Sequence, residues 1–360
     1  MRIMIGIGHP KQVHIRKNII NNLVEDGHEV KIVTWDKDIT SYLLNVYGFK
    51  YEIIGKNYKG LMKKAYGMLK SDFKLFKIAK RFKPDILVWG SPYLAHVSKL
   101  IGKPHIDFTD TEHAKLATLI SFPFSDVICT PSCYRGKIDP KKHVMYNGYE
   151  ELAYLHPNYF KPDPGVLDDL GLSKEDRFII IRFVSWRASH DVGQHGFELR
   201  KLQIFVKELE KFGKVLITSE AELKKDFEKY KIKVPPEKMH DLLYYATMYI
   251  GEGATMASES AILGTPAIYV NTLRLGCLDE KEKRYGLVYN FSNSKTAQKD
   301  ALAKAVELLE DGNQKSKWQR KREKLLSEKI DVTKFMTDFI ENHPESFEKW
   351  EVNNPKEVRI

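Results

Sequence analysis

Short apolar runs alternate with segments of helical periodicity along the first half of the chain. Apolar runs of this length predict strands. They lie at residues 3–7, 30–34, 51–55, 85–90, 105–108 and 126–129. Because strands that alternate with helical segments need crossover connections, this half of the chain predicts a parallel, doubly wound α/β sheet.

A second α/β region follows a stretch that is rich in turn-forming residues. Pro157, Pro162, Pro164 and Gly165 lie close together, which is typical of a linker between domains. The apolar runs beyond this stretch lie at residues 178–184, 214–218, 248–250 and 267–270. A chain of 360 residues is also long for a single core, so we expect two domains.

Residues 249–270 carry the strongest indication of function. They are predicted to form a strand, a glycine loop, a helix, a turn and a second strand. Gly251 and Gly253 let the backbone turn off the strand, and the unpaired N–H groups of residues 254–257 then form a site for a phosphate or diphosphate. Glu259 lies within the first two turns, where its carboxylate can bind a vicinal diol such as the two hydroxyls of a ribose.

This segment, with Thr255, Glu259, Gly264 and Pro266 at their spacing, resembles the nucleotide-sugar segment of GT-B glycosyltransferases. Within that superfamily, the segment resembles most clearly that of the N-acetylglucosaminyltransferase that makes lipid II. It also resembles the matching segment of the UDP-N-acetylglucosamine 2-epimerases. Four further segments resemble a prokaryotic family of that superfamily that is catalogued as being of unknown function. They are residues 8–10, 110–113, 146–157 and 184–191.

The resemblance implies a GT-B-like α/β fold. Two Rossmann-like, doubly wound parallel-sheet domains would face a cleft, and a C-terminal helix would cross back to the first domain. Residues 1–160 would form the acceptor and catalytic domain, residues 161–330 the nucleotide-sugar-binding domain, and residues 331–360 a helical tail packed on the first domain. In this interpretation Glu259 binds the ribose, and the diphosphate lies at the start of the helix. The residues expected there are Gly253, Thr255, Met256 and Ser258.

A polar loop directly after the first strand of the second domain is the second candidate for donor binding. It contains Arg182, Ser185, Arg187 and His190, and ligands of open α/β sheets bind at the carboxyl ends of strands. Arg187 can donate two hydrogen bonds to a diphosphate, Ser185 can bind its oxygens, and His190 can act near a sugar. The alternative is an ordinary polar loop.

An acidic cluster after a strand of the first domain supplies candidate catalytic groups. Asp110, Glu112 and His113 lie together there, and His14 follows the first strand. Inverting glycosyl transfer needs a general base that removes the proton of the acceptor hydroxyl, and an epimerase also needs a carboxylate or imidazole near the sugar ring. For each residue alone, a helix cap or a solvated loop is the alternative.

The formal net charge of +10 favours a partner that carries phosphate. The sequence has no nucleic-acid-binding signature, so we expect no nucleic acid partner. We also expect no metal site and no other cofactor, because no Asp-x-Asp motif follows a second-domain strand and the three cysteines lack the paired spacing of a zinc site. No apolar stretch is long enough to span a membrane and no signal peptide is evident, so the expected location is cytoplasmic.

Residues 59–83 predict a long, basic, amphipathic helix. Its lysines suit an anionic membrane surface, which would place the protein at the inner face of the membrane. The alternative is that the apolar side packs on the first-domain sheet and the lysines face water. The residues expected on that apolar side are Leu61, Ala65, Met68, Leu69, Phe73 and Phe76.

Three functions are compatible with these patterns. The first is an inverting glycosyltransferase with a UDP-N-acetylhexosamine or UDP-hexose donor and a lipid-linked or surface-glycan acceptor. The second is an isomerase or hydrolase of sugar nucleotides that resembles UDP-N-acetylglucosamine 2-epimerase. The third is a nucleotide-sugar-binding protein without catalysis.

Overall fold

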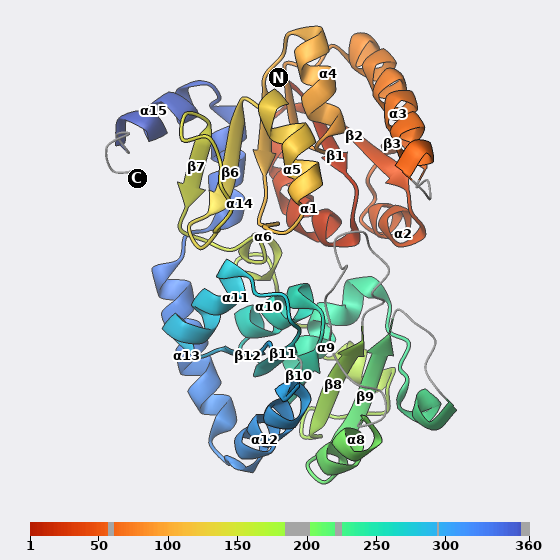
Figure 1. Ribbon diagram of the computed structural model, residues 1–360, viewed down its shortest axis with the longest axis vertical. Helices are drawn as coiled ribbons and strands as arrows, with labels where there is room; N and C mark the ends of the chain where they lie inside the picture. The colour runs from red at the N-terminus through yellow and green to blue at the C-terminus, as the bar shows by residue number, and fades with distance from the viewer. Residues whose placement is uncertain (57–60, 184–201, 220–224, 294, 354–360) are drawn as a thin grey trace. The chain divides into compact units, whose positions relative to one another are not determined.

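The computed structural model describes residues 1–56, 61–183, 202–219, 225–293 and 295–353. The chain divides into two compact units, each with its own parallel sheet (Figure 1). Unit 1 contains Met1–Tyr154 and the chain from Ile330 onward, and unit 2 contains Leu155–Lys329. The sequence analysis placed the boundary after residue 160. The two units meet a few residues earlier, between Tyr154 and Leu155.

The sheet of unit 1 has seven parallel strands in the order β3-β2-β1-β4-β5-β6-β7. They are β1 (Arg2–Ile7), β2 (Glu29–Asp36), β3 (Tyr51–Lys56), β4 (Ile86–Trp89), β5 (His105–Phe108), β6 (Val127–Pro131) and β7 (His143–Tyr146). The helices are α1 (Pro10–Glu25), α2 (Asp38–Val46), α3 (Leu61–Phe82), α4 (Tyr93–Ile101), α5 (Lys115–Ser121), α14 (Val332–Glu341) and α15 (Glu345–Asn353), and α6 (Leu152–Leu155) lies at the junction with unit 2. The apolar runs at β1 and β4 form the centre of the sheet and are buried on both faces.

The C-terminal helices return to unit 1, as the predicted fold class requires. Helix α14 begins after Asp331, whose side chain accepts a hydrogen bond from the backbone N–H of Lys334. The hydroxyl of Thr333 donates to the carbonyl of Ala153 at 2.6 Å. The apolar face of α14, including Met336, is buried in the same unit.

The sheet of unit 2 has five parallel strands in the order β12-β11-β10-β8-β9. They are β8 (Phe178–Phe183), β9 (Lys214–Ser219), β10 (Met248–Gly251), β11 (Ala267–Val270) and β12 (Val288–Phe291). The helices are α7 (Gly165–Asp168), α8 (Leu202–Glu210), α9 (Met239–Tyr245), α10 (Ala254–Leu263), α11 (Gly276–Glu280), α12 (Ala297–Glu310) and α13 (Gln314–Glu328). Two doubly wound parallel sheets thus confirm the predicted α/β class.

Two glycines let the central strands of unit 1 end close together. A Cβ atom added to Gly6 at the end of β1 would lie 2.5 Å from the Cα atom of Gly90, which follows β4. Gly90 also has a φ of +70°, a conformation that side chains other than glycine disfavour. The chain therefore needs glycine at both positions to bring the two strand ends into contact.

We expect Gly6→Ala to lower the free energy of unfolding by about 1–3 kcal/mol, because the new methyl group overlaps backbone that cannot rotate away. Urea unfolding followed by circular dichroism measures this change. Gly312→Ala is the matched control, because a Cβ atom there meets nothing within 4 Å. Equal stability of the Gly6→Ala variant and the wild type would contradict the prediction.

Candidate functional site

Each sheet has a point at which the chain reverses the direction in which it adds strands. In unit 1 the chain builds β2 and β3 on one side of β1 and places β4 to β7 on the other. In unit 2 the same change occurs between β8 and β10. Connections leave the sheet in opposite directions at such points, so the carboxyl ends of these strands are the expected ligand sites.

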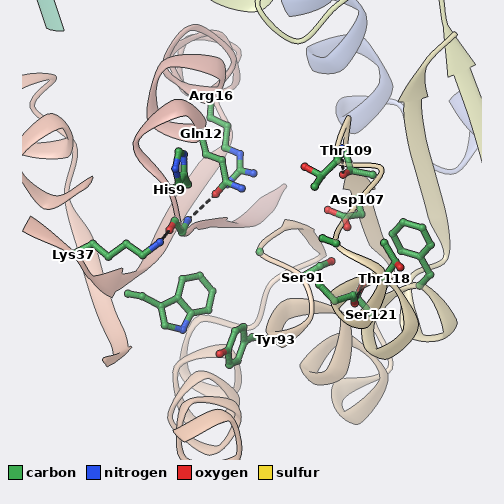
Figure 2. A pocket seen from close by; sticks show the side chains of 17 residues that line it. His9, Gln12, Arg16, Lys37, Ser91, Tyr93, Asp107, Thr109, Thr118 and Ser121 are labelled. Atoms are coloured by element: carbon green, nitrogen blue, oxygen red, sulfur yellow. Dashed lines mark hydrogen bonds between the residues drawn. The ribbon is translucent and has the colours of Figure 1, made fainter. Parts of the chain in front are cut away.

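A pocket of about 350 Å³ lies at this point of unit 1 (Figure 2). Figure 2 shows Gln12 and Arg16 of α1 on one side of the pocket, and Asp107 and Thr109 at the end of β5 on the other. The aromatic rings of Trp35 and Tyr93 also line the pocket. The pocket thus combines charged groups, hydroxyls and aromatic faces, a set that suits a polyhydroxylated ligand such as a sugar.

Arg16 and Asp107 give the pocket two buried groups of opposite charge. Arg16 is 3% exposed, its Nη1 donates to the carbonyl of Gly6, and its guanidinium lies 4.6 Å from the centroid of the Trp89 ring. Burial lowers the pKa of Arg16 to about 9, although the charges of Glu150 and Asp107 oppose this shift. Burial likewise raises the pKa of Asp107, while His105, Ser91 and Arg16 oppose it. A carboxylate with a raised pKa is a stronger base than an ordinary aspartate.

Lys11 lies at the centre of a cluster of three carboxylates in unit 1. Its Nζ is 2.6 Å from Asp110 Oδ2, 3.1 Å from Glu150 Oε2 and 3.1 Å from Glu151 Oε1. Burial would lower the pKa of Lys11, but the charges of Asp110, Glu151 and Glu150 raise it well above its usual value. Burial and the charge of Asp110 raise the pKa of Glu150 to about 8, against the opposing charge of Lys11. Burial therefore favours the protonated form of Glu150, and Lys11 opposes it.

The predicted catalytic residues have different partners in the structure. Asp110 joins the Lys11 cluster, and Glu112 Oε1 accepts a hydrogen bond from the backbone N–H of Arg135 at 3.1 Å. His14 is buried, with ring centroids 5.8 Å from Tyr47 and 5.7 Å from Tyr154. His113 is half-buried in the loop before α5. None of these four predicted residues is among the described residues that line the pocket of Figure 2.

Sequence reasoning missed several functional candidates of unit 1. They are Lys11, Arg16, Lys37, Asp107, Glu150 and Glu151. Lys37 lines the pocket and donates to the carbonyl of Gly8 at 2.6 Å, and burial lowers its pKa. The position of Asp107 at the carboxyl end of a strand was the signal that could have identified it.

In unit 2, helix α10 begins directly after β10, at the predicted glycine loop. Gly253 precedes the helix and has no side chain with which to cap the N–H groups of the first turn. Thr255 and Met256 in that turn are half-buried, so neighbouring side chains do not cover it completely. Gly251 is required because an added Cβ atom would lie 2.3 Å from the Tyr249 hydroxyl. N–H groups at a helix start of this kind suit an anion.

Glu259 lies further along the same helix and is held by a histidine. Its Oε1 is 3.1 Å from His240 Nε2, and its side chain is 6% exposed. Ser258 is also buried. Arg182, at the end of β8, is half-buried, and its carbonyl accepts a hydrogen bond from the N–H of Glu252 at 3.2 Å. The other predicted donor-binding residues lie outside the described residues: Ser185, Arg187 and His190.

The described part of the chain lacks two further features. No group of three or more His, Cys, Asp or Glu side chains is arranged there to hold a metal ion. No described helix is both long and apolar enough to cross a membrane.

Three solved structures have a fold similar to that of this chain. S. aureus MnaA in a structure with UDP matches with a TM-score of 0.66 and 11% identity, over 97% of each chain. UDP-GlcNAc 2-epimerase from Neisseria meningitidis bound to UDP-GlcNAc matches with a TM-score of 0.62 and 11% identity, over 97% of this chain and 100% of the other. The spinosyn forosaminyltransferase SpnP matches with a TM-score of 0.63 and 14% identity, over 95% and 100%. The fold is therefore the one that glycosyltransferases and 2-epimerases share, as predicted.

Sequence comparison places the chain more narrowly. Uncharacterized protein MJ0665 of Methanocaldococcus jannaschii is 24% identical over 282 residues, which cover 74% of this chain and 80% of that protein. The model of the family described as "Protein of unknown function (DUF354)" matches residues 1–342, and the chain belongs to that family.

Proposed function

We propose that this protein is an inverting glycosyltransferase that uses a UDP-sugar as donor. The observation that carries the proposal is the start of α10, where the N–H groups of half-buried residues follow a glycine N-cap just after the central strand β10 of unit 2. These N–H groups and the helix dipole suit the donor diphosphate and would stabilise its charge as it leaves. Other proteins of this fold have been solved with UDP and with UDP-GlcNAc, which supports a uridine nucleotide as the ligand.

The pocket of unit 1 supports the acceptor half of this proposal. In the transfer, the acceptor oxygen forms a bond to the anomeric carbon of the sugar, the bond from that carbon to the diphosphate breaks, and a base takes the hydroxyl proton. Asp107 is the only carboxylate among the described residues that line the pocket. Its raised pKa suits proton removal, so the geometry favours Asp107 over Asp110, Glu112, His113 and His14 as the base.

A sugar-nucleotide epimerase is the second candidate, and the Lys11 cluster favours it. Burial raises the pKa of Glu150 and favours its protonated form, while other carboxylates lie around the same ammonium group. A protonated and an ionised carboxyl in one cluster are an acid and a base, which isomerisation requires. An epimerase acts on the sugar nucleotide alone, so this function would need no acceptor.

Turnover of donor with and without acceptor tests the proposal. The purified protein is incubated with UDP-glucose or UDP-N-acetylglucosamine, and UDP release is measured with and without glycan or lipid-linked acceptors. A transferase releases UDP only when an acceptor is present. A new hexosamine isomer, or free sugar with UDP, in proton NMR spectra of enzyme and donor alone would favour the epimerase. If the protein binds the donor but turns it over under none of these conditions, the result favours a nucleotide-sugar-binding protein without catalysis.

Glu259→Ala tests the donor site itself. We expect UDP affinity to fall about 10- to 100-fold, because the ribose hydroxyls lose a charged hydrogen-bond partner. Isothermal titration calorimetry with UDP and with 2′-deoxy-UDP measures the effect. The wild type should bind UDP more tightly than 2′-deoxy-UDP, and the variant should bind the two nucleotides equally.

Two controls separate ribose binding from folding. Glu259→Gln keeps a partner for His240, and its thermal unfolding shows whether the buried pair is needed for stability. Glu323→Ala changes an exposed carboxylate of α13 and should leave UDP affinity unchanged. Unchanged UDP affinity in a folded Glu259→Ala variant would overturn the assignment of Glu259 to the ribose.

A further inference from the structure

Helix α3 exposes three large apolar side chains on its outer face. Tyr66 is 63% exposed, Leu69 is 68% exposed and Phe73 is 61% exposed. Residues three and four apart lie on the same side of a helix, so the three side chains form one stripe. Contiguous exposed apolar side chains of this size mark interaction surfaces on soluble proteins.

The stripe is distinct from the face that α3 uses to pack in unit 1. Leu75, Ile78 and Ala79 are buried in the core with residues of β1, β2 and β4. Leu69 and Phe73 therefore lie outside the packed side of α3, contrary to the alternative in which the whole apolar side packs on the sheet. The core contact uses Leu75, Ile78 and Ala79. The side chains of Leu69 and Phe73 face away from this contact.

Exposed basic residues lie beside the apolar stripe on the same helix. Lys70, Lys74, Lys77, Lys80 and Arg81 are all exposed on α3. The Nζ atom of Lys77 lies 4.4 Å from the ring centroid of Phe73, so charge and apolar surface are adjacent.

The acidic content of α3 does not offset these charges. Asp72 is the only acidic residue in the sequence of the helix, and its Oδ2 lies 3.0 Å from His96 Nδ1. Arg81 is paired with Glu52 at 2.7 Å, which leaves the four exposed lysines as the dominant charge of the surface. The outer face of α3 is thus both apolar and strongly positive.

We propose that the outer face of α3 docks on an anionic lipid bilayer. Tyr66, Leu69 and Phe73 would enter the interface between headgroups and acyl chains, and the lysines would contact lipid phosphates. A second copy of the chain is a poor partner for this face, because the lysines of the two α3 helices would repel each other. A nucleic acid would bind the lysines through its phosphates but would offer Leu69 no apolar surface. The inference does not depend on the proposed reaction.

Vesicle co-sedimentation without any nucleotide tests this inference. The full-length protein should sediment with vesicles that contain phosphatidylglycerol and stay in solution with phosphatidylcholine alone. Leu69→Gln with Phe73→Gln should weaken binding at least about tenfold. Lys70→Gln, Lys74→Gln and Lys77→Gln together should weaken it about fivefold for each lysine and reduce its dependence on salt.

Matched variants show whether the effect belongs to α3. Lys299→Gln, Lys315→Gln and Lys324→Gln remove the same charge from exposed positions of unit 2, and Ile204→Gln removes an exposed apolar side chain there. These variants should bind anionic vesicles like the wild type. Circular dichroism confirms that all variants are folded.

Four outcomes would overturn the inference. They are failure of the wild type to bind anionic vesicles, equal losses in the α3 and control variants, full binding by the Leu69 and Phe73 double variant, and a dimer in solution that this double variant abolishes. Titration with UDP of the same preparations keeps the result separate from the proposed function, because a protein that binds no UDP can still bind vesicles.

Discussion

Replacing Asp107 with asparagine is expected to lower the turnover number about 10²- to 10⁴-fold and to leave UDP affinity unchanged. Asp107 lines the pocket of unit 1, whereas the proposed diphosphate site belongs to unit 2. Asparagine keeps the size of the side chain but cannot accept the proton of an acceptor hydroxyl. Steady-state kinetics with a saturating donor measures the turnover, and calorimetry with UDP measures the affinity.

Four parallel variants identify the base. Asp110→Asn, Glu112→Gln, His113→Gln and His14→Gln should retain more turnover than Asp107→Asn, because none of these residues is among the described residues that line the pocket. A loss of turnover in one of them, with normal turnover in Asp107→Asn, would contradict the assignment. Since each variant alters a different environment, thermal unfolding of all five accompanies the kinetics.

The pH dependence of turnover provides a further check on Asp107. A general base acts only when it is deprotonated, so activity should fall as the pH drops through the pKa of Asp107. Burial raises that pKa from the usual 3.8, so the acid limb should lie above the one expected for an exposed aspartate. Asp107→Asn should lack this limb in its residual activity.

Local pattern was sufficient to predict most of the fold. The apolar runs of the central strands were visible because a strand buried on both faces must be apolar along its length. The strands β7 and β12 were not predicted, since no more than two of the four residues in each are buried and neither forms a continuous apolar run. Helix α3 was predicted almost to the residue, but its faces were not, because a helix with apolar residues around much of its circumference does not show which side meets the core.

The candidate site was predictable only where its residues are neighbours in sequence. The start of α10 and Glu259 lie within one short segment, so their spacing was informative. Lys11 and Glu150 meet only because β1 and β7 end at the same edge of one sheet. Asp107 lies within the apolar run of β5, and only its position at the carboxyl end of that strand indicated a site.

Replacing Lys11 with methionine is expected to lower the free energy of unfolding by about 3–5 kcal/mol near neutral pH. Lys11 is the ammonium group within 3.1 Å of Asp110, Glu150 and Glu151. Methionine fills a similar volume, so the loss comes from burying carboxylates without a counter-charge. Urea unfolding at several pH values measures the change.

The effect of Lys11→Met should depend on pH in a defined direction. The folded-state pKa of Glu150 is about 8, above its usual 4.5, so the folded wild type binds one more proton than the unfolded chain between these values. The stabilisation from protonated Glu150 is therefore complete below pH 4.5 and is lost as the pH rises through about 8. The cost of removing Lys11 should follow the ionisation of the cluster, and so rise with pH and be larger near pH 8 than near pH 5.

Lys31→Met is the matched control for the Lys11 variant. Lys31 pairs with Glu52 at 2.8 Å, but the two side chains are 30% and 32% exposed. Water screens such a pair, so its loss should cost at most about 1 kcal/mol. Equal costs for the two variants, or a cost of Lys11→Met that stays constant with pH, would show that the cluster is screened by water as the surface pair is. Glu150 would then hold no proton near neutral pH, and the observation that favours an epimerase would be lost.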